Sequence, residues 1–283
     1  MKKSVLVIGN LNHKLKKVLD KCIDDKLIFH YVNYEIYNEK HKKVNEDMQL
    51  VGAQLSNEQF CDMFIHTTKD LDNWIILKGD IHTKDFLRII IGFEKGLNPN
   101  NNSLFLSHIV EIVGKNMSFY LSDGALNTKQ IEDRNVLGNI IKNAQNYIIS
   151  KKQEISKVDP IISTAIILAA NNSNIPGYEV ADTKVFDAPD RKHIEIKQFD
   201  ECFDLASYLI KNPEADAESF TYPDLVITPD ITVGNCIWKS LTILNNYYAK
   251  GYVIGGRLTT ILLSRSDSEE SYYESIKGVC NEN

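Results

Sequence analysis

Residues 74–91 read WIILKGDIHTKDFLRIII, and this stretch contains the pattern that decides the fold. The run Trp74–Leu77 is short, apolar and rich in isoleucine, which is typical of a buried strand. It stops at Lys78-Gly79-Asp80, and apolar residues then recur at positions 86, 87, 90 and 91, the spacing of one helix face. A strand, a polar turn and a helix in this order predict a parallel α/β unit.

The same order recurs along the chain. Its first occurrence is the run Ser4–Ile8, which is followed by Gly9-Asn10 and the helix-like segment Lys14–Cys22. Further strands are predicted at Leu27–Val32, Ser118–Leu121, Pro160–Ala169, Asp224–Ile227, Tyr252–Ile254 and Thr260–Leu263, and a long helix is predicted at Thr128–Ile149. A chain with about seven such strands belongs to the α/β class, with mainly parallel sheets.

Composition excludes several protein classes. The 283 residues are 43% hydrophobic and 25% charged, which excludes a disordered or collagen-like chain. At about 150 residues per domain, the length predicts one large or two modest domains. The net charge of −6 is made of interspersed signs, so we expect no nucleic-acid partner.

Cysteine and histidine spacing argues against disulfides and metal sites. The 5 cysteines form no C-x-x-C pair, and the 7 histidines form no pair three or four residues apart. His108 is interpreted as a core or edge histidine rather than a ligand. The apolar run Val5–Ile8 is far shorter than the roughly 20 residues of a membrane span. We therefore expect a cytoplasmic protein with no membrane partner.

Small, hydroxylated and basic residues follow the predicted strands. They are Lys78-Gly79-Asp80, Ser122-Asp123-Gly124, Asp230, Gly255-Gly256-Arg257 and Ser264-Arg265. In open parallel sheets, ligands bind beyond the carboxyl ends of the strands, near helix N-termini with unpaired N–H groups. This composition therefore predicts a site for a phosphate-sized anion.

The segment Thr259–Ser271 is the sharpest of these signals. Ser266 with Glu269, or Asp267 with Glu270, fits a capping box for a last helix, and capping alone explains these residues without a ligand. Arg265 is different, because a cation in the first turn of a helix opposes the helix dipole unless an anion lies beside it. Arg88 and Lys78 are further basic candidates, each with the alternative of an ordinary solvated side chain.

Other nucleotide and hydrolase motifs are absent from the sequence. It contains no G-x-G-x-x-G fingerprint, no phosphate-binding G-x-x-x-x-G-K-[ST] loop and no G-x-S-x-G elbow. Four segments nevertheless resemble the phosphate acetyltransferase/phosphate butyryltransferase family, and by length its butyryl branch. They are Leu77–Gly79 with Thr83–Arg88, Leu106–Ile109, Ser122–Asn127, and Pro229–Asn235 with Tyr252–Ser268.

The resemblance implies a two-lobed fold like that of isocitrate dehydrogenase, with a cleft between the lobes and a homodimeric assembly. The lobes are expected at residues 1–118 plus 259–283 and at residues 119–258. Acyl-CoA, inorganic phosphate and acyl phosphate are the expected partners, with coenzyme A as a substrate and no bound cofactor or metal. The expected enzyme is an acyltransferase that moves a short or branched-chain acyl group between coenzyme A and phosphate.

The resemblance also assigns site residues. Ser264 and Arg265 match the pair that serves the acyl phosphate in the family, and Arg88 matches its phosphate-binding arginine. The further binding residues expected are Lys78, Gly79, Thr83, Ser122, Asn127, Asp230 and Asn235. For the chemistry we expect direct attack of the coenzyme A thiolate on the acyl phosphate in one ternary complex. Asp267 is the candidate base, with Glu269 and Glu270 as competitors.

Two alternatives stay open. The family's D-G-P-L segment is missing from residues 195–200, and Ser271 stands where acetyltransferases have a proposed acidic base. A paralogue that binds acyl phosphate or coenzyme A without catalysis would explain both departures. A metal-dependent dehydrogenase on the same scaffold is the second alternative, for which Asp224, Asp230 and Asp267 are only weak candidates as the clustered aspartates of a metal site.

Overall fold

The computed structural model describes residues 3–34, 61–62, 64–65, 71–100, 104–115, 118–127, 134–155, 162–167, 194–199 and 223–281. The chain divides into two compact units. Unit 1 comprises Met1–Phe105 and Lys250–Asn283, and unit 2 comprises Leu106–Ala249. Among the described helices, none combines the length and the apolar character that crossing a bilayer requires.

Unit 1 is built on a mainly parallel sheet. Its strands are β1 (Lys3–Ile8), β2 (Ile28–Tyr34), β3 (Trp74–Lys78), β9 (Tyr248–Ile254, of which residues 250–254 belong to this unit) and β10 (Thr259–Ile261), in the spatial order β2-β1-β3-β10-β9. β1 pairs in parallel with β2 and β3, and β3 pairs in parallel with β10. β9 is antiparallel to β10. The carboxyl ends of β3 and β10 therefore lie side by side at one edge of the sheet.

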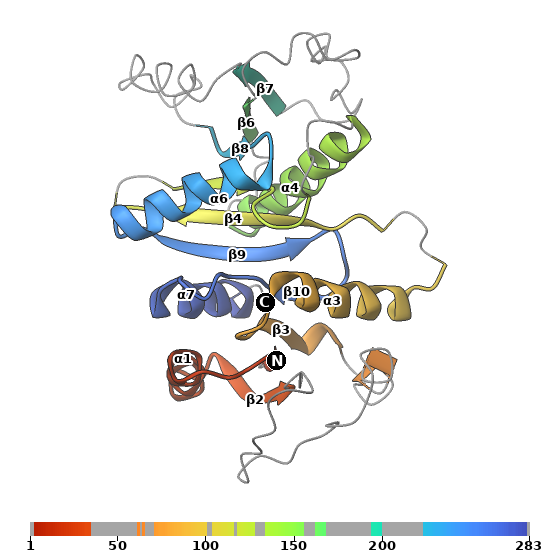
Figure 1. Cartoon of the computed structure of the whole chain (residues 1–283), viewed down its shortest axis with the longest axis vertical. Coiled ribbons are helices and arrows are strands. Elements are labelled where there is room, and N and C mark those ends of the chain that lie inside the picture. Colours follow the sequence, from red (N-terminus) through yellow and green to blue (C-terminus); the bar gives the residue numbers. More distant parts are fainter. Residues whose placement is uncertain are drawn as a thin grey trace. The chain divides into compact units, whose positions relative to one another are not determined.

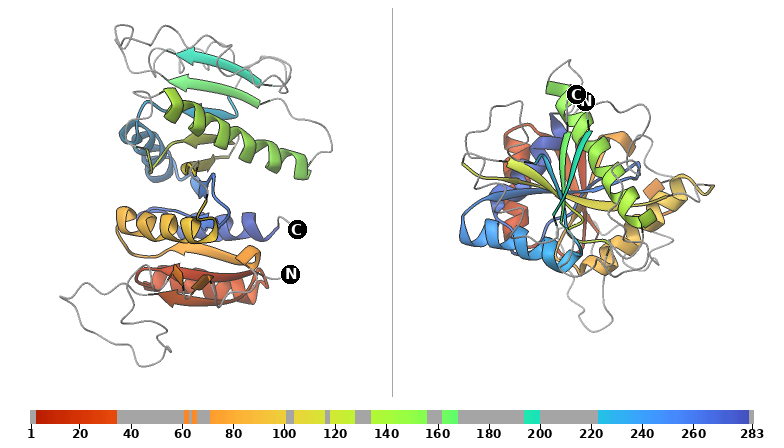
Figure 2. Two further views of the ribbon diagram at one scale, coloured as in Figure 1. Left: turned by 90° about the vertical axis from the view of Figure 1, so that its right-hand side faces the viewer. Right: turned by 90° about the horizontal axis from the view of Figure 1, so that it is seen from above.

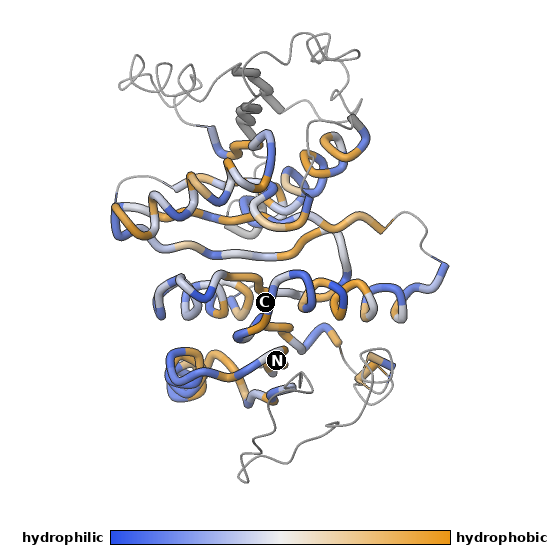
Figure 3. Tube along the Cα trace, viewed as in Figure 1, coloured by the Kyte–Doolittle hydropathy of each residue, from blue (hydrophilic) through white to orange (hydrophobic). Residues whose placement is uncertain are grey.

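Helices cover both faces of this sheet. α1 (His13–Asp24) and α7 (Glu269–Cys280) pack against each other on one side, and α3 (Thr83–Leu97) lies on the other (Figure 1). The central strands are buried because helices cover them on both faces: Val5 and Val7 of β1 and Ile75–Leu77 of β3 are all 0% exposed. Hydrophobic and hydrophilic residues alternate around α3, as expected for a helix with one face on the core (Figure 3).

The loop between β9 and β10 is tied to α3. The Glu94 carboxylate, 4% exposed, accepts hydrogen bonds from the backbone N–H groups of Arg257 at 2.9 Å and Leu258 at 2.8 Å. A Cβ atom at Gly256 would overlap this carboxylate. Glycine at this position is therefore what lets the loop approach the buried acid so closely.

Unit 2 repeats the design. Its strands are β4 (Ser107–Val113), β5 (Ser118–Ser122), β6 (Ile162–Ile167), β7 (Ile194–Phe199) and β8 (Leu225–Ile227), in the order β4-β5-β8-β6-β7. β4 and β5 are antiparallel, and the remaining pairs are parallel. α4 (Arg134–Ile155) and α6 (Ile231–Lys239) lie on opposite faces of these strands, and a π-helical turn at Ser240–Leu244 continues α6 (Figure 2).

The predicted α/β class with mainly parallel strands is confirmed. The strands β4 and β7 were not predicted, because charged residues interrupt their apolar runs: Glu111 in β4, and Glu195 and Lys197 in β7. The predicted helix Thr128–Ile149 corresponds to α4, which is described from Arg134, and residues 128–133 lie outside the described part of the chain.

The units divide the chain at other positions than the sequence suggested. Residues 106–118, expected in the first lobe, cluster with unit 2, because β4 pairs along its length with β5. Residues 250–258, expected in the second lobe, cluster with unit 1, because β9 pairs with β10. The cleft between lobes stays a prediction.

Candidate active site

A closed turn follows β10 and contains the predicted catalytic residues Ser264, Arg265 and Asp267. The Asp267 carboxylate accepts a hydrogen bond from the Ser264 N–H at 2.7 Å, and the Asp267 N–H donates to the Ser264 carbonyl at 2.9 Å. The Ser264 and Ser266 hydroxyls share a hydrogen bond of 3.0 Å. Asp267 is only 3% exposed, so its carboxylate holds the turn together from inside.

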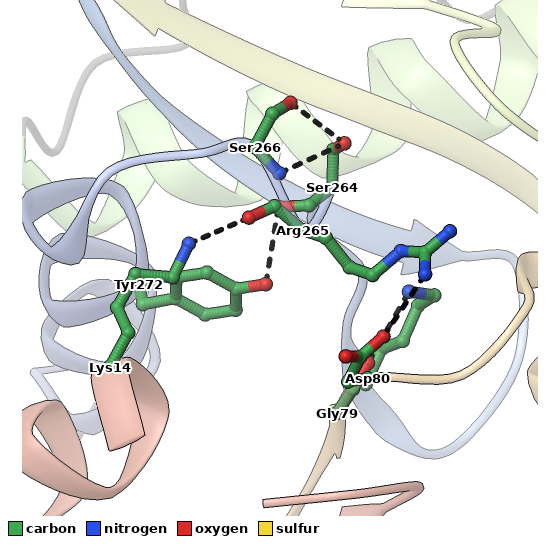
Figure 4. A network of polar contacts seen from close by, with 8 residues as sticks. Lys14, Gly79, Asp80, Ser264, Arg265, Ser266 and Tyr272 are labelled. Atoms are coloured by element: carbon green, nitrogen blue, oxygen red, sulfur yellow. Dashed lines mark hydrogen bonds and ion pairs between the residues drawn. The ribbon is translucent and has the colours of Figure 1, made fainter. Parts of the chain in front are cut away.

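Two helices fix this turn from outside. Lys14 Nζ, on α1, donates to the carbonyls of Arg265 at 2.7 Å and Asp267 at 2.6 Å. The Tyr272 hydroxyl, on α7, donates to the Ser264 carbonyl at 3.2 Å (Figure 4). Burial, with the nearby charges of Asp267 and Asp80, raises the pKa of Tyr272, so the phenol stays a donor. The turn is therefore a preformed element of unit 1.

The predicted capping boxes are wrong. α7 begins at Glu269, and its N-cap is Ser268, whose hydroxyl accepts a hydrogen bond from the Ser271 N–H at 3.1 Å. Ser266 and Asp267 lie before this cap and serve the turn instead. Arg265 also precedes the cap, so it does not stand in the first turn of the helix. The argument from the helix dipole therefore does not apply to Arg265.

Arg265 instead reaches the end of the neighbouring strand. Its Nη1 lies 3.2 Å from Asp80 Oδ1, with the side chains 58% and 37% exposed. Asp80 is anchored through its backbone, because its N–H donates to the Asn10 carbonyl at 2.8 Å. The structure thus brings together the polar residues that follow β3 and β10 (Figure 4). The guanidinium is accessible to solvent and is held by a single-atom contact to a carboxylate.

The other predicted residues of unit 1 are placed differently. Lys78 is 2% exposed, and its ammonium donates to the Gly79 carbonyl at 3.4 Å. Gly79 lies so close to β1 that a Cβ atom would approach the Asn10 carbonyl oxygen to 2.9 Å. Thr83 is the first residue of α3. Arg88 is exposed, and its Nη1 lies 3.4 Å from Asp85 Oδ1 on the same helix. Binding roles for these residues stay predictions.

Unit 2 contains a second polar centre, built around Asp123. This carboxylate is 0% exposed and accepts hydrogen bonds from the N–H groups of Ala125 and Leu126, both at 2.9 Å, and of His108 at 3.2 Å. The Asn127 amide donates to it at 2.5 Å. Burial raises the pKa of Asp123, and the N–H donors act against that rise. The centre fixes the loop that follows β5.

The predicted binding residues of unit 2 are all used within this unit. The Ser122 hydroxyl donates to the His108 carbonyl at 2.9 Å, and the Asn235 amide donates to the Gly124 carbonyl at 2.8 Å. Asp230 is the N-cap of α6, where its Oδ1 accepts from the N–H groups of Thr232 at 2.6 Å and Val233 at 2.9 Å. These contacts bring Ser122, Asn127 and Asn235 close to one loop and give each a structural role.

Sequence reasoning missed three residues that organise these sites. The sequence placed Asp80 and Asp123 in turns that follow strands, and Lys14 at the start of a helix, but assigned none of the three a role in a site. Asp80 and Asp123 follow strands directly, a position that makes a carboxylate a candidate in an open sheet. Lys14 gave no such signal, because its partners Arg265 and Asp267 are about 250 residues away along the chain. Among the described residues, no cluster of three or more His, Cys, Asp or Glu side chains is arranged to hold a metal.

Comparisons with known proteins bear on this arrangement. No family model matches the chain. A phosphate acetyltransferase of Rickettsia prowazekii is 24% identical over 237 residues, which cover 78% of this chain and 62% of that protein. A phosphate butyryltransferase of Clostridium beijerinckii is 26% identical over 209 residues, which cover 71% of this chain and 66% of that protein. The chain is similar to phosphate acyltransferases.

Solved structures extend the similarity to the fold. A branched-chain phosphotransacylase from Enterococcus faecalis superposes with a TM-score of 0.67 at 20% identity, covering 99% of this chain and 98% of that chain. A phosphotransacetylase from Streptococcus pyogenes gives a TM-score of 0.60 at 14% identity, covering 99% of this chain and 94% of that chain. The predicted resemblance to this group is thereby confirmed. The matched region nevertheless spans only 62% of the Rickettsia prowazekii protein, which is less than two thirds of its length.

Proposed function

We propose that this protein is a phosphate acyltransferase that moves a short or branched-chain acyl group between coenzyme A and inorganic phosphate. Its similarity to phosphate acetyl- and butyryltransferases supports the reaction class. The observation that carries the proposal is the turn after β10, which presents the exposed guanidinium of Arg265 beside the end of β3 on a fixed backbone. Coenzyme A enters as a substrate, and the reaction as proposed needs no resident cofactor.

The proposed reaction is direct transfer within one ternary complex. The thiolate sulfur of coenzyme A attacks the carbonyl carbon of the acyl phosphate, so that a C–S bond forms and the C–O bond to phosphate breaks. The phosphate leaves with the electron pair of that bond and about two negative charges. Arg265 neutralises this charge through paired hydrogen bonds, and Ser264 donates to the oxygen on which charge develops.

The thiol proton needs an acceptor, and three carboxylates are candidates for it: Asp267, Glu269 and Glu270. A thiol with a pKa near 8.5 is a few per cent ionised at pH 7, so a base accelerates the reaction but is not indispensable. Asp267 is the proposed base, although its Oδ2 already accepts from the Ser264 N–H. Glu269, which is paired with Lys17 Nζ at 2.7 Å, and Glu270 are its competitors.

Several other residues complete the proposal. Arg88, Lys78, Gly79 and Thr83 are proposed to contribute to the phosphate side of the site. Ser122, Asn127, Asp230 and Asn235 are proposed to contribute to substrate binding, in addition to the contacts they make within unit 2. We also propose a homodimer, which sedimentation equilibrium would test.

The decisive experiment measures coenzyme A release from acetyl-, butyryl- and branched-chain acyl-CoA in the presence of phosphate. Wild-type protein should turn over at least one of them, and Arg265→Ala should lose at least about a hundredfold in kcat/KM. Arg265→Lys should also be severely impaired, because a point charge does not reproduce a bidentate contact. The control is Lys16→Ala, which removes another exposed cation of unit 1, paired with Asp20 at 2.8 Å, and should keep wild-type turnover. Full activity of both Arg265 variants would eliminate the assignment.

One observation favours a second candidate, a protein that binds the ligands without catalysis. Ser271, at the position of the proposed acidic base of acetyltransferases, is 1% exposed, and its N–H and hydroxyl are both within hydrogen-bonding distance of the Ser268 hydroxyl. This serine serves the start of α7. Calorimetric binding of acyl-CoA or acyl phosphate without turnover of any acyl-CoA would favour this candidate.

A further inference from the structure

Lys14 carries a positive charge at the N-terminus of α1, where the helix dipole disfavours a cation. α1 begins at His13 behind the N-cap Asn12, whose side chain accepts from the Leu15 N–H at 2.9 Å, so Lys14 lies in the first turn. That turn contains no acidic residue. A cation at a helix N-terminus opposes the helix dipole, and its position therefore needs a compensating interaction elsewhere.

The compensation comes from the turn after β10. Lys14 Nζ donates to the carbonyls of Arg265 at 2.7 Å and Asp267 at 2.6 Å, which lie on either side of Ser266. The same nitrogen lies 5.2 Å from the ring centroid of Tyr272, whose hydroxyl binds the Ser264 carbonyl. Figure 4 shows Lys14 and Tyr272 on the side of the turn away from the Arg265 guanidinium. Hydrogen bonds from a charged donor are among the stronger ones available to a backbone carbonyl.

We propose that Lys14 is a positioning residue for the phosphate site. By binding two carbonyls of the turn, it fixes the backbone that carries the Arg265 guanidinium and the Ser264 hydroxyl. This inference rests on the proposed function. It gives α1 a role in the site, whereas the site residues predicted from the sequence include none from this helix. Displacements of about 1 Å at such groups cost up to a hundredfold in rate.

The chain offers a matched control on the same helix. Lys17 lies one turn further along α1 and also reaches the C-terminal segment, with its Nζ 2.7 Å from Glu269 Oε2. This pair is exposed, with side-chain exposures of 64% and 45%, and it does not include the turn residues 264–267. Replacing Lys17 thus removes a contact between α1 and α7 but leaves the backbone of the turn in place.

The test compares Lys14→Met, Lys14→Arg and Lys17→Met with the wild-type chain. Lys14→Met should raise the KM for phosphate about tenfold and lower kcat, while Lys17→Met should stay within about twofold of wild type in both. Lys14→Arg should recover part of the loss, since a guanidinium also donates to two acceptors. A merely structural role would lower the fraction of active protein, which reduces the apparent kcat and leaves the KM for phosphate unchanged.

Hydrogen exchange supplies a readout that does not depend on activity. The N–H groups of Ser264 and Asp267 are bonded within the turn and report directly on its closure. They should exchange faster in Lys14→Met than in Lys17→Met. A wild-type KM for phosphate in Lys14→Met, no recovery with arginine, or equal exchange in both methionine variants would overturn the proposal. Wild-type protein without any turnover would refute the proposed function, and the exchange comparison would still decide the role of Lys14.

Discussion

The ion pair between Arg265 and Asp80 joins two side chains that both remain accessible to water. Exposed ion pairs of this kind contribute about 0–1 kcal/mol, because water and salt screen the charges. A phosphate dianion offers the guanidinium more negative charge and two oxygens at once. In the proposed site, the Asp80 carboxylate therefore competes weakly with phosphate for the Arg265 guanidinium.

Replacing Asp80 by asparagine should strengthen phosphate binding. The variant keeps the side-chain shape and the backbone contacts with Asn10 but removes the competing charge. From the small free energy of an exposed pair, we expect the KM for phosphate to fall by about two- to fivefold. Steady-state kinetics with varied phosphate at fixed acyl-CoA measures this change.

The control for this variant is Asp20→Asn. It removes a carboxylate from another exposed pair of unit 1, in which Lys16 Nζ lies 2.8 Å from Asp20 Oδ2, and should leave the KM for phosphate unchanged. A loss of kcat in Asp80→Asn with an unchanged KM would contradict competition. That outcome would place Asp80 in the chemical step instead.

At the scale of the elements, helix α6 begins at the N-cap Asp230, a residue that the sequence analysis expected to bind substrate. Asp230 accepts hydrogen bonds from two N–H groups at the start of this helix, which has 9 residues and continues into a π-helical turn. A helix this short draws a large part of its stability from its ends and its packing. Asp230 therefore has a structural role whether or not it also contacts a substrate.

Removing that cap should destabilise the protein. Asp230→Ala should lower the free energy of unfolding by about 1 kcal/mol, while Asp230→Asn, which keeps an acceptor oxygen, should lose only a few tenths. Urea unfolding followed by far-UV circular dichroism measures both. If Asp230→Asn keeps its stability but loses kcat/KM, the carboxylate also binds substrate, as the sequence predicted.

The sequence predicted elements well where the apolar run was continuous. β1, β3 and β8 are buried on both faces, and their runs of branched aliphatic residues predicted them correctly. The start of α7 was misplaced because Ser266, Asp267 and Ser268 are all acceptable N-caps by residue type. Their choice depends on the tertiary contacts of the turn with Lys14 and Tyr272, which local sequence does not contain.

At the scale of the whole molecule, the two polar centres were predictable to different degrees. The turn at Ser264 and Arg265 followed from the resemblance and from its place after a strand. The structural use of Ser122, Asn127 and Asn235 did not, because residue type alone does not distinguish a side chain that binds a ligand from one that binds a backbone carbonyl. The anchoring partners of these side chains come from segments far apart in the chain.

Stability of the folded chain should depend on pH through Asp123. Burial raises the pKa of this carboxyl above its ordinary value of 3.8, so the folded state holds the proton more tightly than the unfolded state. Its contribution to stability is therefore fully present below about pH 4 and is lost as the pH rises through the raised pKa.

The comparison with Asp123→Asn isolates this effect. The free energy of unfolding of the wild type minus that of the variant should fall as the pH rises from about 4. Urea unfolding at a series of pH values measures the slope, and any constant offset from altered hydrogen bonds does not affect it. A difference that grows with pH would mean that the four N–H donors outweigh burial.

Glu94, the buried acid of α3, and Gly256, in the β9–β10 loop, restrict the substitutions that this chain can accept. The space that any side chain at position 256 needs is already filled by the Glu94 carboxylate, and two N–H groups of the loop depend on that carboxylate. Neither position can be exchanged alone without leaving a clash or two unsatisfied donors. Across descendants of the same ancestor, positions 94 and 256 should therefore covary, although about 160 residues of chain separate them.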